Sequence, residues 1–159
     1  MTLTTATLTY RTIDPRRDAD LLLAHQLETC IASFGDDAHF QGAGRYLEWV
    51  KSKVEEFPEG FLLAFLDGRC VGQMELEVPY GRTAGYVNLF YVTRPFRGLG
   101  FGRVMHERAE AYFRSWEATS TRLHVSPTNE RALRFYRRMG YRRTSDYPGG
   151  VLWEMVKDL

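Results

Sequence analysis

Apolar residues recur along the chain with two periods, which together predict a succession of strands and helices. Alternating apolar and polar residues, or short runs rich in β-branched and aromatic residues, predict strands. Strands are predicted over residues 8–13, 61–66, 70–78, 86–92, 122–125, 141–145 and 151–156. Apolar residues spaced three and four apart predict amphipathic helices. Helices are predicted over residues 19–34, 46–57, 101–116 and 127–139.

Local signals indicate where several of these elements begin and end. Gly35 closes the first helix and Pro58 stops the second. Asp67-Gly68 favours a tight turn, so the strands on either side of it are expected to form a β-hairpin. Ser126-Pro127 predicts the start of the last helix with Ser126 as its N-cap, and Gly140 is suited to the position just after its end.

The order of these elements predicts a mixed α/β fold. Hairpins give antiparallel strand pairs, whereas a helix between two strands allows a parallel pair. We therefore expect one central mixed β-sheet of about seven strands with helices on both faces. No repeat, linker or low-complexity tract interrupts the sequence, so residues 1–159 are expected to form a single domain.

Composition narrows the classes of function without selecting one. The chain is 44% hydrophobic and 26% charged with a net charge of +1, which is typical of a globular protein and gives no general attraction to nucleic acid. We expect no membrane span and no secretory signal, and hence a cytoplasmic protein. Cys30, Cys70 and the four histidines do not have the spacing of metal ligands, so no metal is expected.

The most informative stretch is the loop between a strand and a helix at the centre of the chain. Three alternating glycines, Gly98, Gly100 and Gly102, lie between Arg97 and Arg103. Backbone N–H groups at a helix start have no partner inside the helix, and the helix dipole adds partial positive charge there. Glycines let this backbone approach an anion closely, and arginines pair with phosphate oxygens. The stretch therefore predicts a phosphate or pyrophosphate site.

Two well-known phosphate-binding loops do not match this stretch. A P-loop requires Lys and then Ser or Thr after its last glycine, whereas Arg103-Val104 follows Gly102. A dinucleotide-binding fingerprint requires its third glycine at position 103, which is Arg.

Two sequence blocks occur in the order and spacing of a known family. The first, residues 97–102, matches an Arg/Gln-x-x-Gly-x-Gly/Ala loop that opens a central helix. The second places Asn129, Ala132 and Tyr136 after an apolar strand and ends with Gly140-Tyr141. The chain thereby resembles the GNAT-type N-acetyltransferase superfamily, and the order of its elements extends the resemblance to its full length.

The resemblance implies where acetyl-CoA binds. In this family two central parallel strands splay apart and the pantetheine arm of acetyl-CoA lies in the gap; here the strands are 86–92 and 122–125. The first strand would pair its backbone with pantetheine amides, the loop N–H groups would hold the pyrophosphate, and Asn129 would contact the pantetheine. The implied acetyl-CoA-binding residues are Phe90, Tyr91, Val92, Arg97, Gly98, Leu99, Gly100, Phe101, Gly102, Arg103, Asn129 and Tyr136.

The resemblance also implies transfer of an acetyl group to a primary amine by direct attack in a ternary complex. The reaction requires a neutral amine, N–H groups that stabilise an oxyanion, and a proton donor for the leaving thiolate. Tyr136 takes the donor's place in the motif. No Glu lies on either splayed strand, so the base remains open. The candidates are His124, whose usual pKa suits neutral pH, and Glu75 or Glu77 acting through water. A further alternative is an enzyme without a dedicated base, which captures the small neutral fraction of its amine.

The sequence does not identify the amine, which is a small molecule, an amino acid or a peptide or protein. The resemblance places its entrance between the first two helices, the 35–45 loop and the turn at 147–150. Transfer of a longer acyl group is an alternative to acetyl transfer, and a non-catalytic acyl-CoA-binding or sensor module is an alternative to an enzyme. The chain could also form a homodimer. No membrane partner is expected, since no membrane span is predicted. No nucleic-acid partner is expected, because the arginine-rich residues 131–143 are typical of a solvated helix face.

Overall fold

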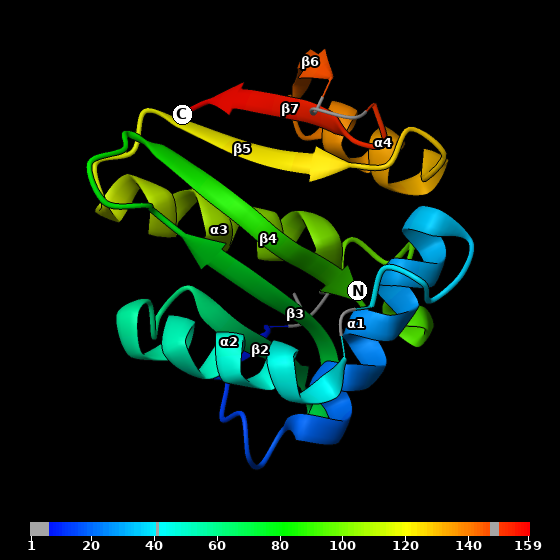
Figure 1. Ribbon diagram of the computed structural model, residues 1–159. Helices are drawn as coiled ribbons and strands as arrows, with labels where there is room; N and C mark the ends of the chain where they lie inside the picture. Colours follow the sequence, from blue (N-terminus) through cyan, green and yellow to red (C-terminus); the bar gives the residue numbers. More distant parts are fainter. Residues whose placement is uncertain (1–6, 41, 147–149) are drawn as a thin grey trace, which may run out of the picture.

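A computed structural model describes residues 7–40, 42–146 and 150–159 (Figure 1). The strands are β1 (Thr9–Thr12), β2 (Phe61–Leu66), β3 (Arg69–Glu77), β4 (Ala84–Val92), β5 (Ser120–Val125), β6 (Arg142–Asp146) and β7 (Trp153–Asp158). The helices are α1 (Ala19–Phe34), α2 (Ala43–Glu56), the 3₁₀ turn η1 (Arg94–Phe96), α3 (Phe101–Ser115) and α4 (Glu130–Arg138). The predicted order of strands and α-helices is confirmed.

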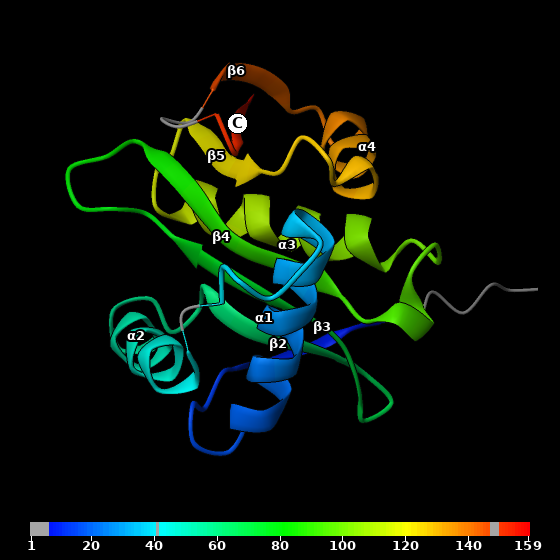
Figure 2. The same ribbon diagram turned by 45° about the vertical axis from the view of Figure 1, so that its right-hand side comes forward.

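The strands form one seven-stranded sheet in the order β1-β2-β3-β4-β5-β7-β6. The pair β4–β5 at its centre is parallel and the other pairs are antiparallel. Helices α1 and α2 cover one face of the sheet and α3 covers the other (Figures 1 and 2). The predicted mixed sheet with helices on both faces is therefore confirmed.

Strand β2 shows how the sequence supports burial on both faces. Its uninterrupted apolar run is typical of a strand covered on both sides. Phe61 and Leu63 pack with Leu22 of α1 and Val50 of α2, whereas Leu62 lies in a second core that includes Phe113, Met105 and Leu123.

None of the described helices is long and apolar enough to cross a membrane.

The local signals at Gly35, Pro58, Asp67-Gly68 and Gly140 are confirmed, and the signal for the start of the last helix is wrong. Asp67 and Gly68 have φ angles of 48° and 77°, which fits the tight hairpin turn between β2 and β3. Helix α4, however, begins at Glu130 rather than at Pro127. Asn129 is its N-cap and accepts from the Ala132 N–H at 3.3 Å, while the Ser126 hydroxyl accepts from the Thr128 N–H within the preceding turn. Both residues are good N-cap types, and Ser126 caps a turn instead.

The central parallel strands splay apart after a few residues. Pairing of β4 with β5 runs only from Ala84↔Ser120 to Val87↔Leu123. On the opposite edge of β4, Glu75 pairs with Leu89 and the next residue of β3 pairs with Val87, so Asn88 is an extra residue that forms a β-bulge. Beyond this bulge β4 turns away from β5 and leaves a gap (Figure 1).

Gly85 brings β4 against α3 just before this divergence. A Cβ atom at Gly85 would lie 2.2 Å from Cδ1 of Phe113, a fully buried ring on α3. The close approach therefore requires glycine at this position.

We expect Gly85→Ala to lower the free energy of unfolding by about 1–3 kcal/mol, because the added methyl group overpacks the core. Gly44→Ala on α2 is the matched control, since no atom lies within 4 Å of its added Cβ. It should raise stability by about 0.5–1 kcal/mol. Denaturant unfolding measures both, and equal effects of the two substitutions would contradict the packing argument.

Candidate functional site

A cavity of about 350 Å³ lies where β4 and β5 diverge. It is bounded by the end of β4, the glycine loop, α4 and the second half of α1. The lining residues are Thr29, Ala32, Phe90, Tyr91, Val92, Phe96, Arg97, Gly98, Gly100, Gly102, Arg103, Asn129, Arg131, Ala132, Phe135, Tyr136, Arg138 and Met139. Its volume is within the range of small-molecule sites.

The three glycines of the loop serve two different purposes. Gly98 and Gly100 have φ angles of 74° and 89°, in the left-handed region that other residues rarely adopt. Gly102 instead leaves room, since a Cβ there would approach the Phe135 ring of α4 to 3.0 Å. The loop thus turns sharply into α3 and lets α4 pack against the first turn of that helix.

The start of α3 offers donors and positive charge to the cavity. Gly100 is the N-cap of α3 and has no side-chain capping bond, so the first N–H groups of the helix lack helical partners. Arg97, Arg103, Arg131 and Arg138 line the same cavity. Burial and then the nearby charge of Arg97 lower the pKa of Arg131. An anion in this cavity would relieve that repulsion.

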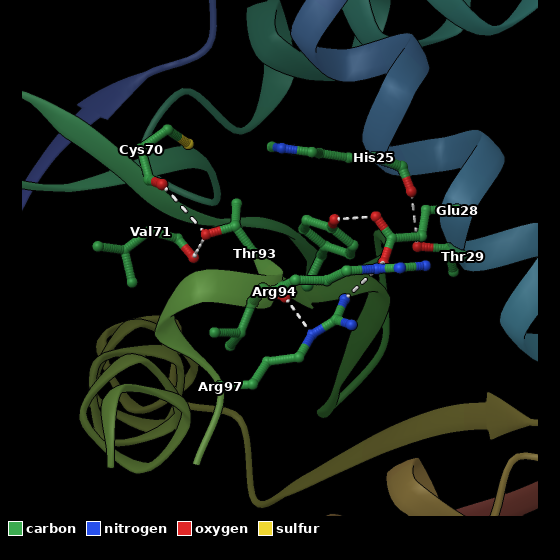
Figure 3. A network of polar contacts seen from close by, with 10 residues as sticks. His25, Glu28, Thr29, Cys70, Val71, Thr93, Arg94 and Arg97 are labelled. Atoms are coloured by element: carbon green, nitrogen blue, oxygen red, sulfur yellow. Dashed lines mark hydrogen bonds and ion pairs between the residues drawn. The ribbon is translucent and has the colours of Figure 1, made fainter. Parts of the chain in front are cut away.

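The edge of β4 that faces the gap is not paired with β5 beyond Val87. The Thr93 N–H donates to the Val71 carbonyl at 2.8 Å, so Thr93 turns its backbone towards β3. The Thr93 hydroxyl also donates to the carbonyls of Val71 and Cys70, at 3.2 Å each (Figure 3). Alternate residues of a strand turn to opposite edges, and Phe90 and Val92 therefore face the gap. The Val92 carbonyl accepts from Nε of Arg97 at 2.7 Å.

Helix α4 places Tyr136 on the cavity wall. Asn129, Ala132, Tyr136 and Met139 follow one another at helical spacing and all line the cavity. The Tyr136 ring lies 5.4 Å from the ring of Tyr141, centroid to centroid. Burial, with a smaller contribution from Tyr141, raises the pKa of Tyr136. The phenol is therefore protonated at neutral pH and able to donate a proton.

His124 lies outside this cavity, in contact with two side chains that the sequence did not indicate. Its Nδ1 is 2.5 Å from the Tyr86 hydroxyl, and its Nε2 is 3.8 Å from a carboxylate oxygen of Glu154 on β7. Burial lowers the pKa of His124, and Glu154 opposes that shift without overcoming it. A neutral imidazole can accept a proton, and the adjacent carboxylate would stabilise the imidazolium.

Glu75 is held in a buried polar network between β3 and the two N-terminal helices. Its carboxylate accepts from the Tyr46 hydroxyl and, at 2.8 Å, from Nε2 of Gln73, whose Oε1 contacts Nδ1 of His25 at 2.8 Å. Burial raises the pKa of Glu75 to about 7, although both donors lower it. Glu77, in contrast, forms an ion pair with Lys53 of α2.

The structure brings together most of the residues that the sequence suggested for acetyl-CoA. Leu99 and Phe101 do not line the cavity: Leu99 is 65% exposed, and Phe101 packs on the Phe96 ring. The sequence reasoning missed cavity-lining residues of two helices and of the turn after β4. The spacing of Ala132 and Met139 was a usable signal, because they lie four and three residues from Tyr136 on one helix face, whereas the α1 residues carried none. The missed residues are Thr29 and Ala32 of α1, Phe96 of the turn after β4, and Arg131, Ala132, Phe135, Arg138 and Met139 of α4 and its C-terminal end.

The predicted entrance for an amine is described only in part. Residues 147–149 of the turn between β6 and β7 lie outside the described residues. From the described side of that region, Tyr46 points into the sheet and bonds to Glu75.

The raised pKa of Glu75 predicts a particular dependence of stability on pH. Between its ordinary value of 4.5 and about 7, the folded chain holds a proton that the unfolded chain has released. The free energy of unfolding therefore falls as pH rises through this window. Relative to Glu75→Gln, which does not titrate, the wild type should lose about 3 kcal/mol of stability between pH 4.5 and pH 8.

Urea unfolding at several pH values measures this difference. The exposed Glu48→Gln on α2 is the control for replacing a glutamate by glutamine at a surface position. A constant difference between wild type and Glu75→Gln would show that the buried carboxylate does not hold the extra proton.

Comparison with known proteins relates this geometry to one family. The sequence profile of the acetyltransferase (GNAT) family matches residues 21–141. A mycothiol acetyltransferase of Acidimicrobium ferrooxidans is 38% identical over 87 residues, 53% of this chain and 28% of the relative. An uncharacterised N-acetyltransferase of Methanocaldococcus jannaschii is 36% identical over 87 residues, 54% of each chain. This chain thus spans about half or less of these curated relatives.

Solved structures show the same fold. The PaiA N-acetyltransferase of Thermoplasma acidophilum, solved with coenzyme A, superposes with a TM-score of 0.70 over 96% of this chain and 99% of that one, at 18% identity. The profile match covers most of the chain, including the glycine loop and α4. The chain belongs to the GNAT acetyltransferase family.

Proposed function

We propose that this protein is an acetyl-CoA-dependent N-acetyltransferase that acts on a primary amine by direct attack in a ternary complex. One observation carries the proposal: a single cavity is lined by the glycine loop before α3, by the part of β4 that is not paired with β5, and by Tyr136. Binding acetyl-CoA and transferring its acetyl group would require these three features.

The described residues fit acetyl-CoA at each end of the cavity. The N–H groups of the α3 start and Arg97, Arg103 and Arg131 suit a diphosphate. The backbone of Phe90 and Val92 suits the amide groups of a pantetheine arm. The coenzyme A complex of PaiA supports this assignment for the same fold. When bound, acetyl-CoA supplies an acetyl group activated as a thioester.

The residues of this chain would then serve the transfer in two ways. The N–H of Val92, which faces the gap, would donate to the acyl oxygen as negative charge develops there. Tyr136 would donate its phenolic proton to the departing thiolate sulfur, since its raised pKa keeps it protonated. The acceptor must arrive with an unprotonated nitrogen, because only the neutral amine has a free electron pair.

We propose His124 as the group that accepts the proton of the amine. The side chain of His124 is 19% exposed, and its contact with Glu154 would stabilise the protonated ring. Glu75 is 2% exposed, and its carboxylate already binds Tyr46 and Gln73, so it would act only through the Tyr46 hydroxyl or a water. Glu77 is committed to Lys53, which leaves it the least suited of the three.

Tyr136→Phe tests the site and the proton donor together. Calorimetry should show that wild type and variant bind acetyl-CoA with nearly equal affinity, because the ring and its packing remain. Turnover should fall by about 10²-fold, the scale of general acid catalysis.

Absence of acetyl-CoA binding by the wild type would refute the proposed function. Wild-type turnover in the variant would make Tyr136 a packing residue. Binding without transfer to any amine, amino acid or peptide would instead favour a sensor module.

The pH dependence of kcat/KM distinguishes the candidate bases. A base must be deprotonated, so activity should be lost as pH falls through its pKa. For His124 this limb should lie below the ordinary value of 6.5, since burial lowers the pKa. His124→Ala should remove the limb and recover activity at high pH, where more of the amine is neutral. If Glu75→Gln removes the limb and His124→Ala leaves it, the assignment to His124 is wrong.

A further inference from the structure

Glu28 of α1 accepts hydrogen bonds from three residues at the end of β4 and in the turn after it, two of which, Tyr91 and Arg97, line the cavity. The donors are the Tyr91 hydroxyl at 2.5 Å, Nε of Arg94 at 2.9 Å and Nη2 of Arg97 at 3.0 Å (Figure 3). Burial by itself raises the pKa of Glu28, but these three donors outweigh it and lower the pKa to about 2. The carboxylate is therefore ionised throughout the physiological range.

The contacts of Arg97 use only one edge of its guanidinium group. Nε donates to the Val92 carbonyl at 2.7 Å, and Nη2 donates to Glu28 at 3.0 Å. Among the described residues no hydrogen bond involves Nη1, and Arg97 lines the cavity. A guanidinium group has five N–H bonds in a fixed plane. The edge formed by Nη1 and the second hydrogen of Nη2 therefore remains for a ligand.

That remaining edge has the geometry of a phosphate site. Two parallel N–H bonds match two oxygens of a phosphate group, which a single ammonium group cannot do. The Tyr91 ring lies under the guanidinium group, 5.4 Å from its carbon, and restricts its position further. Glu28 and Val92 thus hold Nη2 and Nε of Arg97, a residue that lines the cavity, and leave Nη1 without a hydrogen bond among the described residues.

A carboxylate near an anion site would ordinarily weaken binding through repulsion. Here two arginines neutralise it, because Arg94 and Arg97 both form ion pairs with Glu28. Glu28, Arg94 and Arg97 together keep a net charge of +1. The carboxylate therefore orients Arg97 without making the wall of the cavity negative.

We propose that Glu28 is a positioning residue for the binding of acyl-CoA. It holds Arg97 so that the free edge of the guanidinium group meets the diphosphate of the acyl-CoA. This proposal rests on the proposed function and adds a residue outside both sequence blocks. Thr29 follows Glu28 directly and lines the cavity, as does Ala32 one turn later. The same contact therefore also fixes the wall that α1 contributes.

Glu28→Gln tests the proposal, with coenzyme A as the probe in calorimetry. The variant keeps the shape of the side chain but loses the charge that aligns Arg97. The dissociation constant should rise about tenfold, the scale of immobilising one long side chain at binding. Asp20→Asn, an exposed carboxylate in the first turn of the same helix, is the matched control and should bind like wild type.

A double-mutant cycle with Arg97→Gln separates positioning from general damage. If Glu28 acts through Arg97, Glu28→Gln should cost nothing further in the Arg97→Gln background. Thermal unfolding confirms that each variant is folded. If Glu28→Gln does not fold, the shorter Glu28→Asp, which draws the carboxylate back by one methylene, replaces it with the same expectation.

Three results would overturn the inference. Unchanged or tighter binding by folded Glu28→Gln would show that the carboxylate does not help the site. If Glu28→Gln weakens coenzyme A binding by the same factor in the Arg97→Gln background as in the wild type, Glu28 acts by another route. Either result leaves the proposed function standing as long as the wild type binds coenzyme A. Failure of the wild type to bind coenzyme A would overturn both proposals.

Discussion

The early end of the pairing between β4 and β5 is the constraint on which the candidate site depends. Continued parallel pairing would use the backbone groups of both facing edges. Because pairing stops at Val87 and Leu123, and Asn88 adds a bulge, the end of β4 keeps an unpaired edge. The space is then bounded by α4, whose Phe135 ring stacks 5.4 Å from that of Phe90. The cavity is thus a product of sheet geometry before any side chain adds chemistry.

The short loop after β4 meets several requirements at once. Gly98 and Gly100 supply backbone conformations that turn the chain into α3, and Gly102 supplies the space that α4 needs. The same turn exposes N–H groups at the helix start to the cavity. Substituting any of these glycines would therefore disturb the shape of the cavity together with its donors.

Helix α1 takes part in two polar networks. His25 contacts Gln73 and, through it, Glu75 and Tyr46, while Glu28 holds Arg97 on the other side. The ring of His25 also stacks on that of Tyr91, with centroids 4.3 Å apart. Buried polar networks are stable only when each member is satisfied. The position of α1 therefore affects the surroundings of Arg97 and of Glu75 together.

The sequence by itself determined the order of the elements, the hairpin at Asp67-Gly68 and the glycine loop, because hydrophobic periodicity and turn chemistry act over a few residues. It placed the start of α4 wrongly, since Ser126 and Asn129 are both suited to an N-cap. Only the tertiary structure paired Glu28 with Arg97 and Tyr46 with Glu75, which are 69 and 29 residues apart in sequence. Such pairs depend on how α1 and α2 pack on the sheet, and no local pattern encodes that arrangement.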